Sequence, residues 1–294
     1  MYLIIGATGY LGSYFLKNII RETDNKVIAT NNSTEPNFLD TRIKWKKLDL
    51  ANFCSIDNLY NELSLIEKKF KIIFLSSYHH PDQVEKNPKL AWHINVASLD
   101  YFLYKFEKLI ATFYYASSDA VYGESINGYL FNEEDICCPV NTYGRTKFIA
   151  EKLVLLWKFN VIRYPFLIGP SLNNKKHFYD SIYNALYLGN NLDMFGDSYR
   201  SPLDFNSASQ YTIDVIEQYP ALFSQVINIC SDTPLSKYEI ALLIAKNHNF
   251  EPKNINKISI NDNSIFLAKR PATTLMDNLK IKKILNLEKI NLTL

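Results

Sequence analysis

Short apolar segments, each followed by a longer stretch with helical spacing, alternate along most of the chain. In chain order these runs are residues 2–5, 26–30, 43–48, 71–75, 112–116 and 161–168; the third is strand-like but carries three lysines, whereas the others are mainly apolar. An uninterrupted apolar run is typical of a parallel strand, because helices cover both faces of such a sheet. The stretches between the runs place apolar residues three or four apart, which predicts amphipathic helices. The pattern therefore predicts an α/β fold built on a parallel sheet.

Length and composition fit this fold class. With 294 residues, a mass of 34.1 kDa and 47% hydrophobic residues, the chain suits one large α/β unit or a main domain carrying a smaller one. The formal net charge of +2 gives no broad attraction for nucleic acid or an anionic membrane surface. No apolar run approaches the roughly 20 residues that span a bilayer, and the N-terminus lacks a signal-peptide pattern, so we expect a cytoplasmic protein.

The four cysteines form neither a disulfide framework nor a metal-ligand spacing. Cys137 and Cys138 are adjacent, whereas Cys54 and Cys230 are isolated. Free thiols agree with a cytosolic protein. Cys230 follows an apolar run and is predicted to be a small core residue.

The first apolar run passes directly into a turn that contains three glycines. Residues 6–12 read Gly-Ala-Thr-Gly-Tyr-Leu-Gly and lead into an amphipathic helix. In such a unit the first glycine allows the tight turn, the second lets the backbone approach a pyrophosphate, and the third permits close packing of the helix. A merely structural turn is the alternative, but the position between strand and helix favours dinucleotide binding. The predicted cofactor contacts are Gly6, Thr8, Gly9, Tyr10, Leu11 and Gly12.

The end of the second apolar run bears on the choice of cofactor. An NAD-selective site usually carries an acidic residue there, whereas this chain has Asn31 and Asn32. Amide donors without a repelling carboxylate favour NADP, and NAD stays possible because no arginine stands there to bind a 2′-phosphate. Asp49 and Leu50 follow the third run and are predicted to meet the adenine, with a solvated turn aspartate as the alternative.

The segment after the fourth run is predicted to lie at the ligand-binding edge of the sheet. His79 and His80 are adjacent, and the side chains of neighbouring residues on an extended chain point to opposite sides. No carboxylate or cysteine completes a ligand set, so we predict no metal site there. We expect His79 to contact the substrate instead. Because ligands of open α/β sheets bind beyond the carboxyl ends of the strands, the predicted cofactor contacts are Leu75, Ser76, Ser77 and Tyr78.

A long helix is predicted to begin at Asn87, with Pro88 in its first turn. Asn95 is polar among apolar neighbours of this helix, so it requires a buried hydrogen-bond partner. The partner is either structural or part of the site, and we include Asn95 among the candidate substrate contacts.

Two further patterns predict proton-transfer chemistry. Tyr143 and Lys147 are one helical turn apart, which places the phenol and the ammonium on one face, where the cation would stabilise a phenolate and lower the tyrosine pKa. By itself this spacing is equally compatible with a solvated helix face. Ser118 follows the fifth run at the carboxyl end of a predicted strand, where a hydroxyl can hydrogen-bond a carbonyl oxygen. Combined with the glycine turn, these three residues favour a catalytic site at a nicotinamide.

These motifs resemble those of extended short-chain dehydrogenases/reductases of the nucleotide-sugar type, the NAD-dependent epimerase/dehydratase family. The resemblance rests on residues 6–12, 117–123 and 143–147. It implies a Rossmann-type doubly wound parallel sheet with a smaller C-terminal α/β substrate-binding domain. It also implies that Ser118 is the catalytic hydroxyl, that Tyr143 transfers the proton, and that Lys147 holds the nicotinamide ribose. Further cofactor contacts are expected at Ala116, Tyr164 and Phe166.

The resemblance also suggests domain boundaries and substrate contacts. We expect the dinucleotide-binding domain at residues 1–165 and 206–232, and the substrate domain at 166–205 and 233–294. Segments 197–202 and 270–277 are similar to the substrate-domain segments of dTDP-4-dehydrorhamnose reductases, which makes Arg200 and Arg270 candidates for the substrate diphosphate. Both arginines are equally compatible with an ordinary surface role. Many members carry an asparagine at the position of Phe166, and a phenyl ring cannot donate to a sugar or a phosphate.

One departure from related enzymes restricts the chemistry. Nucleotide-sugar 4,6-dehydratases of this superfamily typically carry Asp-Glu after the catalytic residue, whereas here Asp119 is followed by Ala120. A methyl group cannot act as acid or base, so dehydratase chemistry is disfavoured. Asp119 stays a candidate contact for a sugar hydroxyl, with helix or turn capping as the alternative.

The resemblance therefore implies an NAD(P)H-dependent reductase of the 4-keto group of a nucleotide-activated 6-deoxy sugar, acting in the biosynthesis of cell-surface polysaccharides such as lipopolysaccharide or capsule. A 4-epimerase with tightly bound NAD is one alternative. A non-catalytic NAD(P)-binding regulatory subunit is another. The expected partner is a nucleotide-diphosphate sugar, and a homodimer formed through two helices per subunit is a family expectation.

Overall fold

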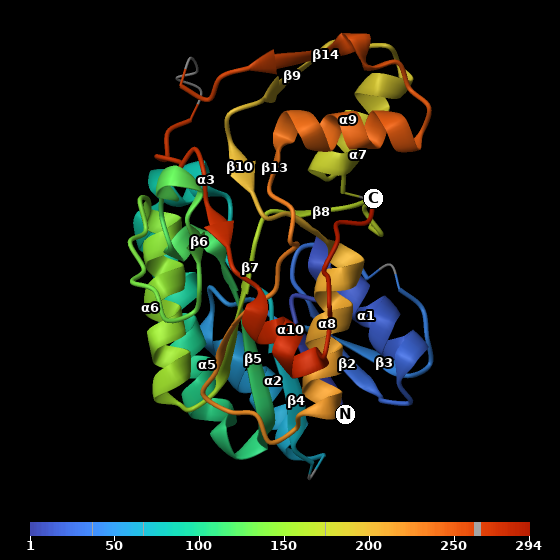
Figure 1. Ribbon diagram of the computed structural model, residues 1–294. Helices are drawn as coiled ribbons and strands as arrows, with labels where there is room; N and C mark the ends of the chain where they lie inside the picture. The colour runs from blue at the N-terminus through green and yellow to red at the C-terminus, as the bar shows by residue number, and fades with distance from the viewer. Residues whose placement is uncertain (37, 67, 174, 262–265) are drawn as a thin grey trace.

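A seven-stranded parallel sheet forms the centre of the protein (Figure 1). The computed structural model describes residues 1–36, 38–66, 68–173, 175–261 and 266–294. The strands lie in the order β12-β7-β5-β4-β1-β2-β3, and each adjacent pair is parallel. This order confirms the predicted Rossmann-type sheet. The strands are β1 (Tyr2–Ile5), β2 (Val27–Asn31), β3 (Ile43–Lys47), β4 (Phe70–Phe74), β5 (Ile110–Ser118), β7 (Asn160–Tyr164) and β12 (Val226–Asn228).

Helices cover both faces of the sheet, so the side chains on both faces of a central strand such as β1 are buried. This explains why apolar and polar residues do not alternate along that strand. In β1, Tyr2 and Ile4 pack into one core, while Leu3 and Ile5 pack into the other. The first core is covered by α1 (Tyr10–Glu22), α8 (Phe205–Gln218) and α10 (Leu279–Leu285). The second is covered by α2 (Phe53–Ser64), α5 (Ser98–Phe106) and α6 (Thr142–Leu156).

The connection between β4 and β5 contains the helix that was predicted to begin at Asn87. It consists of α3 (Pro81–Lys86), α4 (Pro88–Trp92), a π-helical segment (His93–Ala97) and α5, which then leads into a 3₁₀ turn (Glu107–Leu109). Pro88 occupies the first turn of α4, as predicted. Asn95 lies inside the π-helical segment, a local widening that is frequent at functional sites.

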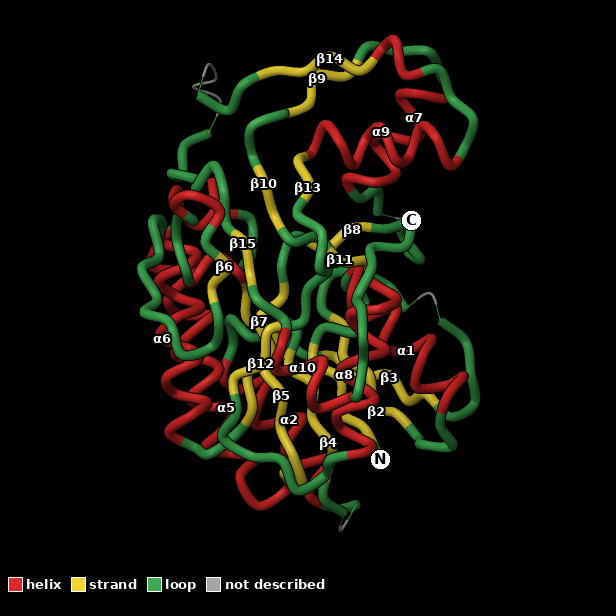
Figure 2. Tube along the Cα trace, viewed as in Figure 1, coloured by secondary structure: helices red, strands yellow, loops and turns green. Residues whose placement is uncertain are grey.

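A smaller unit lies beyond the carboxyl ends of the strands (Figure 2). Its core is formed by helices α7 (Phe178–Tyr187) and α9 (Lys237–Asn247), which pack with the parallel pair β9 (Leu192–Phe195) and β14 (Ile255–Ile258). Short strand pairs link it to the sheet. They are β10 (Tyr199–Arg200) with β13 (Leu235–Ser236), β8 (Leu167–Ile168) with β11 (Leu203–Asp204), and β6 (Leu130–Phe131) with β15 (Leu275–Met276). Further 3₁₀ turns occur at Asp119–Val121, Ile126–Gly128 and Pro252–Asn254.

The C-terminal end departs from the predicted domain boundary. Residues 233–294 were all expected in the substrate domain. Ile281 and Ile290 are instead buried in the core between the sheet and helices α1 and α8. The chain then returns to the smaller unit, where Leu292 and Leu294 pack against its core. Cys230 is fully buried as predicted, and its thiol donates to the Met276 carbonyl at 3.3 Å. None of the helices in the described ranges is long and apolar enough to cross a membrane.

Candidate active site

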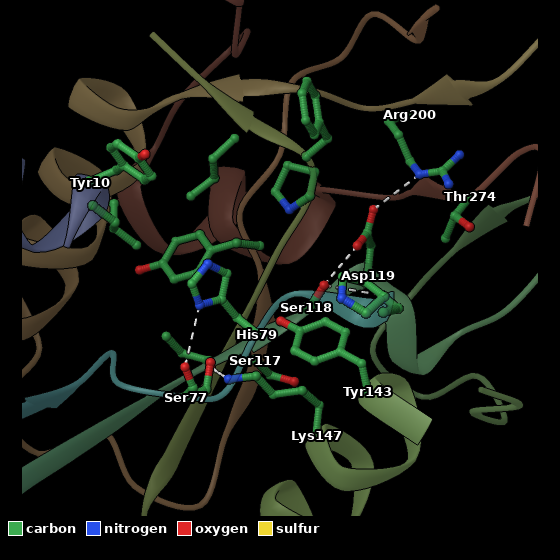
Figure 3. A pocket seen from close by; sticks show the side chains of 18 of the residues that line it. Tyr10, Ser77, His79, Ser117, Ser118, Asp119, Tyr143, Lys147, Arg200 and Thr274 are labelled. Carbon is green, nitrogen blue, oxygen red and sulfur yellow. Dashed lines mark hydrogen bonds and ion pairs between the residues drawn. The ribbon is translucent and has the colours of Figure 1, made fainter. Parts of the chain in front are cut away.

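A cavity of about 640 Å³ lies between the carboxyl ends of the strands and the smaller unit. Gly9 and Tyr10 form part of its wall on the dinucleotide side, and Arg200 and Lys237 contribute from the smaller unit. Figure 3 shows Ser118, Tyr143 and Lys147 close together within it. Segments far apart in the sequence therefore meet beyond the carboxyl ends of β1 and β4, the neighbouring strands between which the strand order reverses. Open α/β sheets bind their ligands at this position.

The glycine turn has the geometry predicted from the sequence. Gly6 has a φ of 93°, and a Cβ there would lie 2.5 Å from the Ser76 hydroxyl. A Cβ at Gly12 would lie 2.3 Å from the Gly6 carbonyl oxygen. Helix α1 begins at Tyr10, after Gly9, so the first backbone amides of the helix lie at the cavity wall without a capping side chain. Such an end can accept a pyrophosphate, because its amides and the helix dipole both favour an anion.

Some of the predicted cofactor contacts line this cavity and others do not. Thr8 does not line it, and its carbonyl accepts a hydrogen bond from the Asn173 side chain at 3.2 Å. The amide of Asn32 lies 3.4 Å from a carboxylate oxygen of Asp49, at the adjacent ends of β2 and β3. Asn31, Asn32, Asp49, Leu50, Ser76 and Tyr78 also lie outside the cavity wall, and their cofactor contacts stay predictions. Leu75, Ser77, Ala116, Tyr164 and Phe166 line the cavity together with Gly6, Gly9, Tyr10, Leu11 and Gly12.

Helix α6 carries Tyr143 and Lys147 on one face, as the spacing predicted. The side chain of Asn141 caps the helix by accepting from the Gly144 amide at 2.9 Å, which fixes the first turn next to Tyr143. Lys147 is 2% exposed. Its ammonium donates to the Ala116 carbonyl at 2.7 Å and lies 4.6 Å from the centre of the Tyr115 ring. Burial lowers the pKa of Lys147 to about 7, and Glu151 partly opposes this change.

The electrostatic expectation for Tyr143 was wrong. The sequence predicted that Lys147 lowers the tyrosine pKa, yet the pKa of Tyr143 is raised, first by burial and then by the negative charge of Asp119. A hydrogen bond with Ser118 partly opposes the rise. The Lys147 ammonium lies 6.0 Å from the centre of the Tyr143 ring and bonds to the backbone of β5 instead. The chain therefore keeps Tyr143 protonated.

Ser118 is tied to the acidic residue that follows it. Its hydroxyl donates to the Asp119 carboxylate at 2.8 Å and accepts from the Ala120 amide at 3.2 Å. Asp119 is 8% exposed and lies 3.6 Å from the Arg200 guanidinium. Burial raises the pKa of Asp119, while Arg200 and Ser118 oppose the rise. Figure 3 shows the resulting chain of polar groups from Arg200 through Asp119 to Ser118, next to the phenol of Tyr143.

Two predicted substrate contacts are not supported by the structure. The Asn95 amide is used by the backbone N–H and C=O of Tyr78 and by the Thr146 hydroxyl, so Asn95 positions the loop after β4 and does not line the cavity. Arg200 lines the cavity, but its Nη1 and Nη2 atoms donate to the carbonyls of Tyr199, Ala272 and Pro271 at 2.7–2.8 Å. These contacts use three of the four hydrogens on the two Nη atoms.

The other predicted substrate contacts do line the cavity. His79 is exposed to it, with Nδ1 3.4 Å from the Ser77 carbonyl. Arg270 is part of the wall and donates to Asp82 at 2.8 Å. Within the described residues, no group of three or more histidine, cysteine, aspartate or glutamate side chains is arranged to hold a metal ion.

Several residues of the cavity wall were not predicted from the sequence, and His177 and Lys237 are two of them with titratable side chains. The His177 ring lies 4.6 Å from that of Tyr10 and 4.9 Å from that of Phe205, and burial lowers its pKa to about 4. Lys237 is the first residue of α9. The capping pattern of Ser236 and Glu239 in the sequence identifies that helix start, but only the fold brings the helix to the cavity.

A family model described as "RmlD substrate binding domain" matches residues 1–292 of the chain. The chain belongs to this family. Among curated relatives, Methionine adenosyltransferase 2 subunit beta of Rattus norvegicus is 24% identical over 288 residues, covering 96% of this chain and 81% of that protein. The dTDP-4-dehydrorhamnose reductase of Aggregatibacter actinomycetemcomitans is 23% identical, covering 97% of this chain and 93% of that protein.

Solved structures share the fold of this RmlD-family chain along its length. A hypothetical dTDP-4-dehydrorhamnose reductase from Sulfolobus tokodaii has a TM-score of 0.81 at 24% identity, covering 100% of this chain and 97% of that one. The dTDP-4-dehydrorhamnose reductase of Bacillus anthracis in complex with NADP has a TM-score of 0.78 at 19% identity, covering 96% and 92%. These similarities agree with the doubly wound sheet and the second unit beyond it.

Proposed function

We propose that this RmlD-family chain is an NADPH-dependent reductase of the 4-keto group of a nucleotide-activated 6-deoxy sugar. The observation that carries the proposal is the meeting of Ser118, Tyr143 and Lys147 in one cavity with the open N-terminus of α1. Gly9 and the amides of α1 suit the pyrophosphate of a dinucleotide, and the cavity continues to the smaller unit, where a second ligand has room. NAD is the alternative cofactor.

Each catalytic residue has a role that follows from its surroundings. The bound cofactor supplies the hydride that reduces the carbonyl carbon. Tyr143, kept protonated by burial and by Asp119, gives its proton to the carbonyl oxygen, so that the ketone becomes an alcohol. Ser118 lies beside the phenol and holds the same oxygen by a hydrogen bond. Lys147, fixed by the Ala116 carbonyl, holds the ribose next to Tyr143.

Replacement of the phenol tests this role. Tyr143→Phe should abolish turnover and leave NADPH affinity unchanged, because the ring stays and only the transferable proton is lost. The assay follows loss of reduced-nicotinamide absorbance with a panel of nucleotide 4-keto-6-deoxy sugars. Tyr129→Phe is the control, since this exposed tyrosine bonds to Asp135 outside the cavity. Unchanged turnover in Tyr143→Phe rules out the proposed proton transfer.

A non-catalytic NAD(P)-binding subunit is the second candidate function. The observation that favours it is the similarity to Methionine adenosyltransferase 2 subunit beta, a protein whose name describes a subunit of another enzyme. Cofactor binding without NADPH oxidation on any sugar of the panel would favour this candidate. Co-purified NAD, with sugar interconversion but no net consumption of nicotinamide, would instead identify the 4-epimerase.

A further inference from the structure

The ammonium of Lys147 lies over the ring of Tyr115, 4.6 Å from the ring centre. The ring of Tyr143 is farther away, at 6.0 Å, which is about the limit of a cation–π contact. The same ammonium donates to the carbonyl of Ala116 at 2.7 Å. Two consecutive residues of β5 therefore hold this cation, Tyr115 by its ring and Ala116 by its backbone.

Tyr115 is itself fixed by the sheet and its core. In the strand register it is paired with Phe74 on β4 and with Val161 on β7. Its side chain is 1% exposed and packs into the core covered by α2, α5 and α6, where the ring centre lies 6.2 Å from that of Phe74. A close-packed ring on a central strand keeps its position, so its face is presented to α6 in a defined place.

Lys147 requires such support because its charge is buried without a counter-ion. The side chain is 2% exposed, and within the described residues its ammonium forms no ion pair. Glu151 lies one turn further along α6, but both of its carboxylate oxygens are bonded to Arg163. A buried charge without a partner costs free energy, and the face of an aromatic ring in a desolvated site offsets part of that cost.

The titratable groups around the ammonium leave this contribution to the ring. The titratable and charged groups on the surrounding elements are Tyr143 and Glu151 on α6, Tyr115 on β5, Arg163 on β7, Asp119 in the turn after β5 and His79 in the loop after β4. Burial raises the pKa of both phenols, which therefore stay neutral. Burial lowers the pKa of His79, so its imidazole is neutral at pH 7 and above. The Asp119 carboxylate contacts Ser118 and Arg200.

We infer that the ring of Tyr115 is a cation–π seat that keeps the Lys147 ammonium in place and in its charged form, which makes Tyr115 a positioning residue of the candidate active site. The Ala116 carbonyl accepts one of the three ammonium hydrogens, so the others can be donated into the cavity that Lys147 lines. The inference rests on the proposed function only for the ligand that these hydrogens meet, the nicotinamide ribose.

Titration of the Lys147 amine in the full chain without cofactor tests the cation–π seat. Carbon-13 at the Cε atom of the lysines gives nuclear magnetic resonance signals that follow the charge of each amine, and the signal absent from Lys147→Met belongs to Lys147. Because burial lowers the pKa of Lys147 to about 7, this signal should titrate near neutral pH in the wild type.

The variants weaken the contact without changing the packing. Position 115 receives phenylalanine, and then phenylalanine with one, two or three fluorine atoms on its ring. Fluorine withdraws electron density from the face of the ring and nearly preserves its shape, so only the attraction for a cation falls. Tyr115→Leu removes the ring. Tyr114→Leu is the matched control, because Tyr114 has an equally buried ring in the core on the other face of the sheet.

Tyr115→Phe should keep the titration midpoint of the wild type, because the ring remains and the hydroxyl that is lost is buried without a hydrogen-bond partner among the described residues. Each added fluorine should move the midpoint to lower pH, since a weaker contact stabilises the charged form less. In Tyr115→Leu the charged fraction of Lys147 at pH 8 should fall by about fivefold or more. Tyr114→Leu should leave the midpoint in place.

The inference is overturned if the midpoint does not depend on fluorination or moves to higher pH. It is also overturned if Tyr114→Leu moves the midpoint as far as Tyr115→Leu does, because a general loosening of β5 would then explain the change. If Tyr115→Leu does not fold, the fluorinated series decides alone, since its members keep the shape of the ring.

NADPH affinity at pH 8 connects the cation–π seat to the proposed function, and it should fall with each fluorine in parallel with the charged fraction of Lys147. Constant affinity with a falling midpoint supports the seat and contradicts the ribose contact. A falling midpoint in a chain that reduces no keto sugar supports the seat and contradicts the reductase. Turnover of a keto sugar, with a midpoint that fluorination leaves in place, supports the reductase and contradicts the seat.

Discussion

The hydroxyl of Ser118 donates to the carboxylate of Asp119 at 2.8 Å, and the other carboxylate oxygen lies 3.6 Å from the Nε atom of Arg200. Ser118 therefore offers its proton to Asp119 and can offer it to a substrate carbonyl only by exchanging partners. The same carboxylate contributes to the raised pKa of Tyr143. Asp119 thus influences two groups of the candidate active site, its chain neighbour Ser118 at the end of β5 and Tyr143 on α6.

Asp119→Asn should move the alkaline limb of the kcat/KM profile for ketone reduction to lower pH. The substitution removes a negative charge that opposes ionisation of Tyr143, so the pKa of the phenol falls. Tyr143 must be protonated to act as the acid, and the rate declines as it ionises. The measurement is the pH dependence of kcat/KM, with Asp232→Asn as a control that removes a carboxylate outside the cavity. A limb that stays in place or moves to higher pH contradicts the role of Asp119.

Lys147→Met should raise the free energy of unfolding of the cofactor-free protein, and the gain should be larger at pH 6 than at pH 9. Burial lowers the pKa of Lys147 from 10.5 to about 7. Between these values the unfolded chain binds a proton that the folded chain does not, so the contribution of this lysine to stability increases with pH. Below about pH 7 the folded protein carries a buried charge, and the penalty that methionine removes is greatest.

Urea denaturation at both pH values measures this difference. Lys152→Met is the matched control, because Lys152 lies on the same helix with its side chain exposed. Subtracting the change in the free energy of unfolding that Lys152→Met causes at each pH leaves the contribution of the buried lysine. An equal gain at pH 6 and pH 9 would show that Lys147 keeps its charge when the protein is folded.

The ion pair between Glu151 and Arg163 connects α6 to β7 and should be important for stability. Glu151 is 0% and Arg163 is 3% exposed, and the guanidinium makes two hydrogen bonds to the carboxylate, at 2.9 and 2.7 Å. Glu151→Ala leaves a buried guanidinium without its partner and should cost about 3–5 kcal/mol in the free energy of unfolding.

The double variant Glu151→Leu with Arg163→Met provides the control for this prediction. It removes both charges and fills the space with apolar side chains, so it should lose less stability than Glu151→Ala alone. Urea denaturation of the three proteins gives the comparison. If the double variant is the least stable, packing around these side chains, and not the unpaired charge, determines the cost.

Much of the fold could be predicted from the sequence because its signals are local. The apolar run at 2–5 passes directly into the glycine turn, and the structure has β1 followed by α1 at that place. Tyr143 and Lys147 share a helix face because their spacing equals one turn. Neighbours along the chain were enough to predict these features.

The polar environment of the site depends on contacts between distant segments, which explains the errors. The Asn95 amide is bonded to Thr146, 51 positions away, and Arg200 is bonded to carbonyls some 70 positions away. Lys147 faces the ring of Tyr115 from another element, which no helical spacing can indicate. Lys237 reaches the cavity only because α9 packs above it. The residue types at the site were therefore predictable, but their hydrogen-bond partners were not.

Alanine at two glycines of the turn should separate cofactor binding from folding. At Gly9 the backbone has an ordinary φ of −74°, and an added Cβ meets only the Gly6 carbonyl at 3.3 Å, so Gly9→Ala should fold with little loss of stability. Its methyl group stands at the exposed cavity wall and should weaken NADP binding by about tenfold or more.

At Gly12 a Cβ would lie 2.3 Å from the Gly6 carbonyl oxygen and 2.8 Å from the Cα of Ala7, both backbone atoms that cannot rotate away. Gly12→Ala should therefore cost about 1–3 kcal/mol in the free energy of unfolding, in addition to any loss of cofactor affinity. Fluorescence titration with NADPH and urea denaturation measure the two effects. NADP affinity equal to wild type in Gly9→Ala would mean that the cofactor does not approach the backbone at the start of α1.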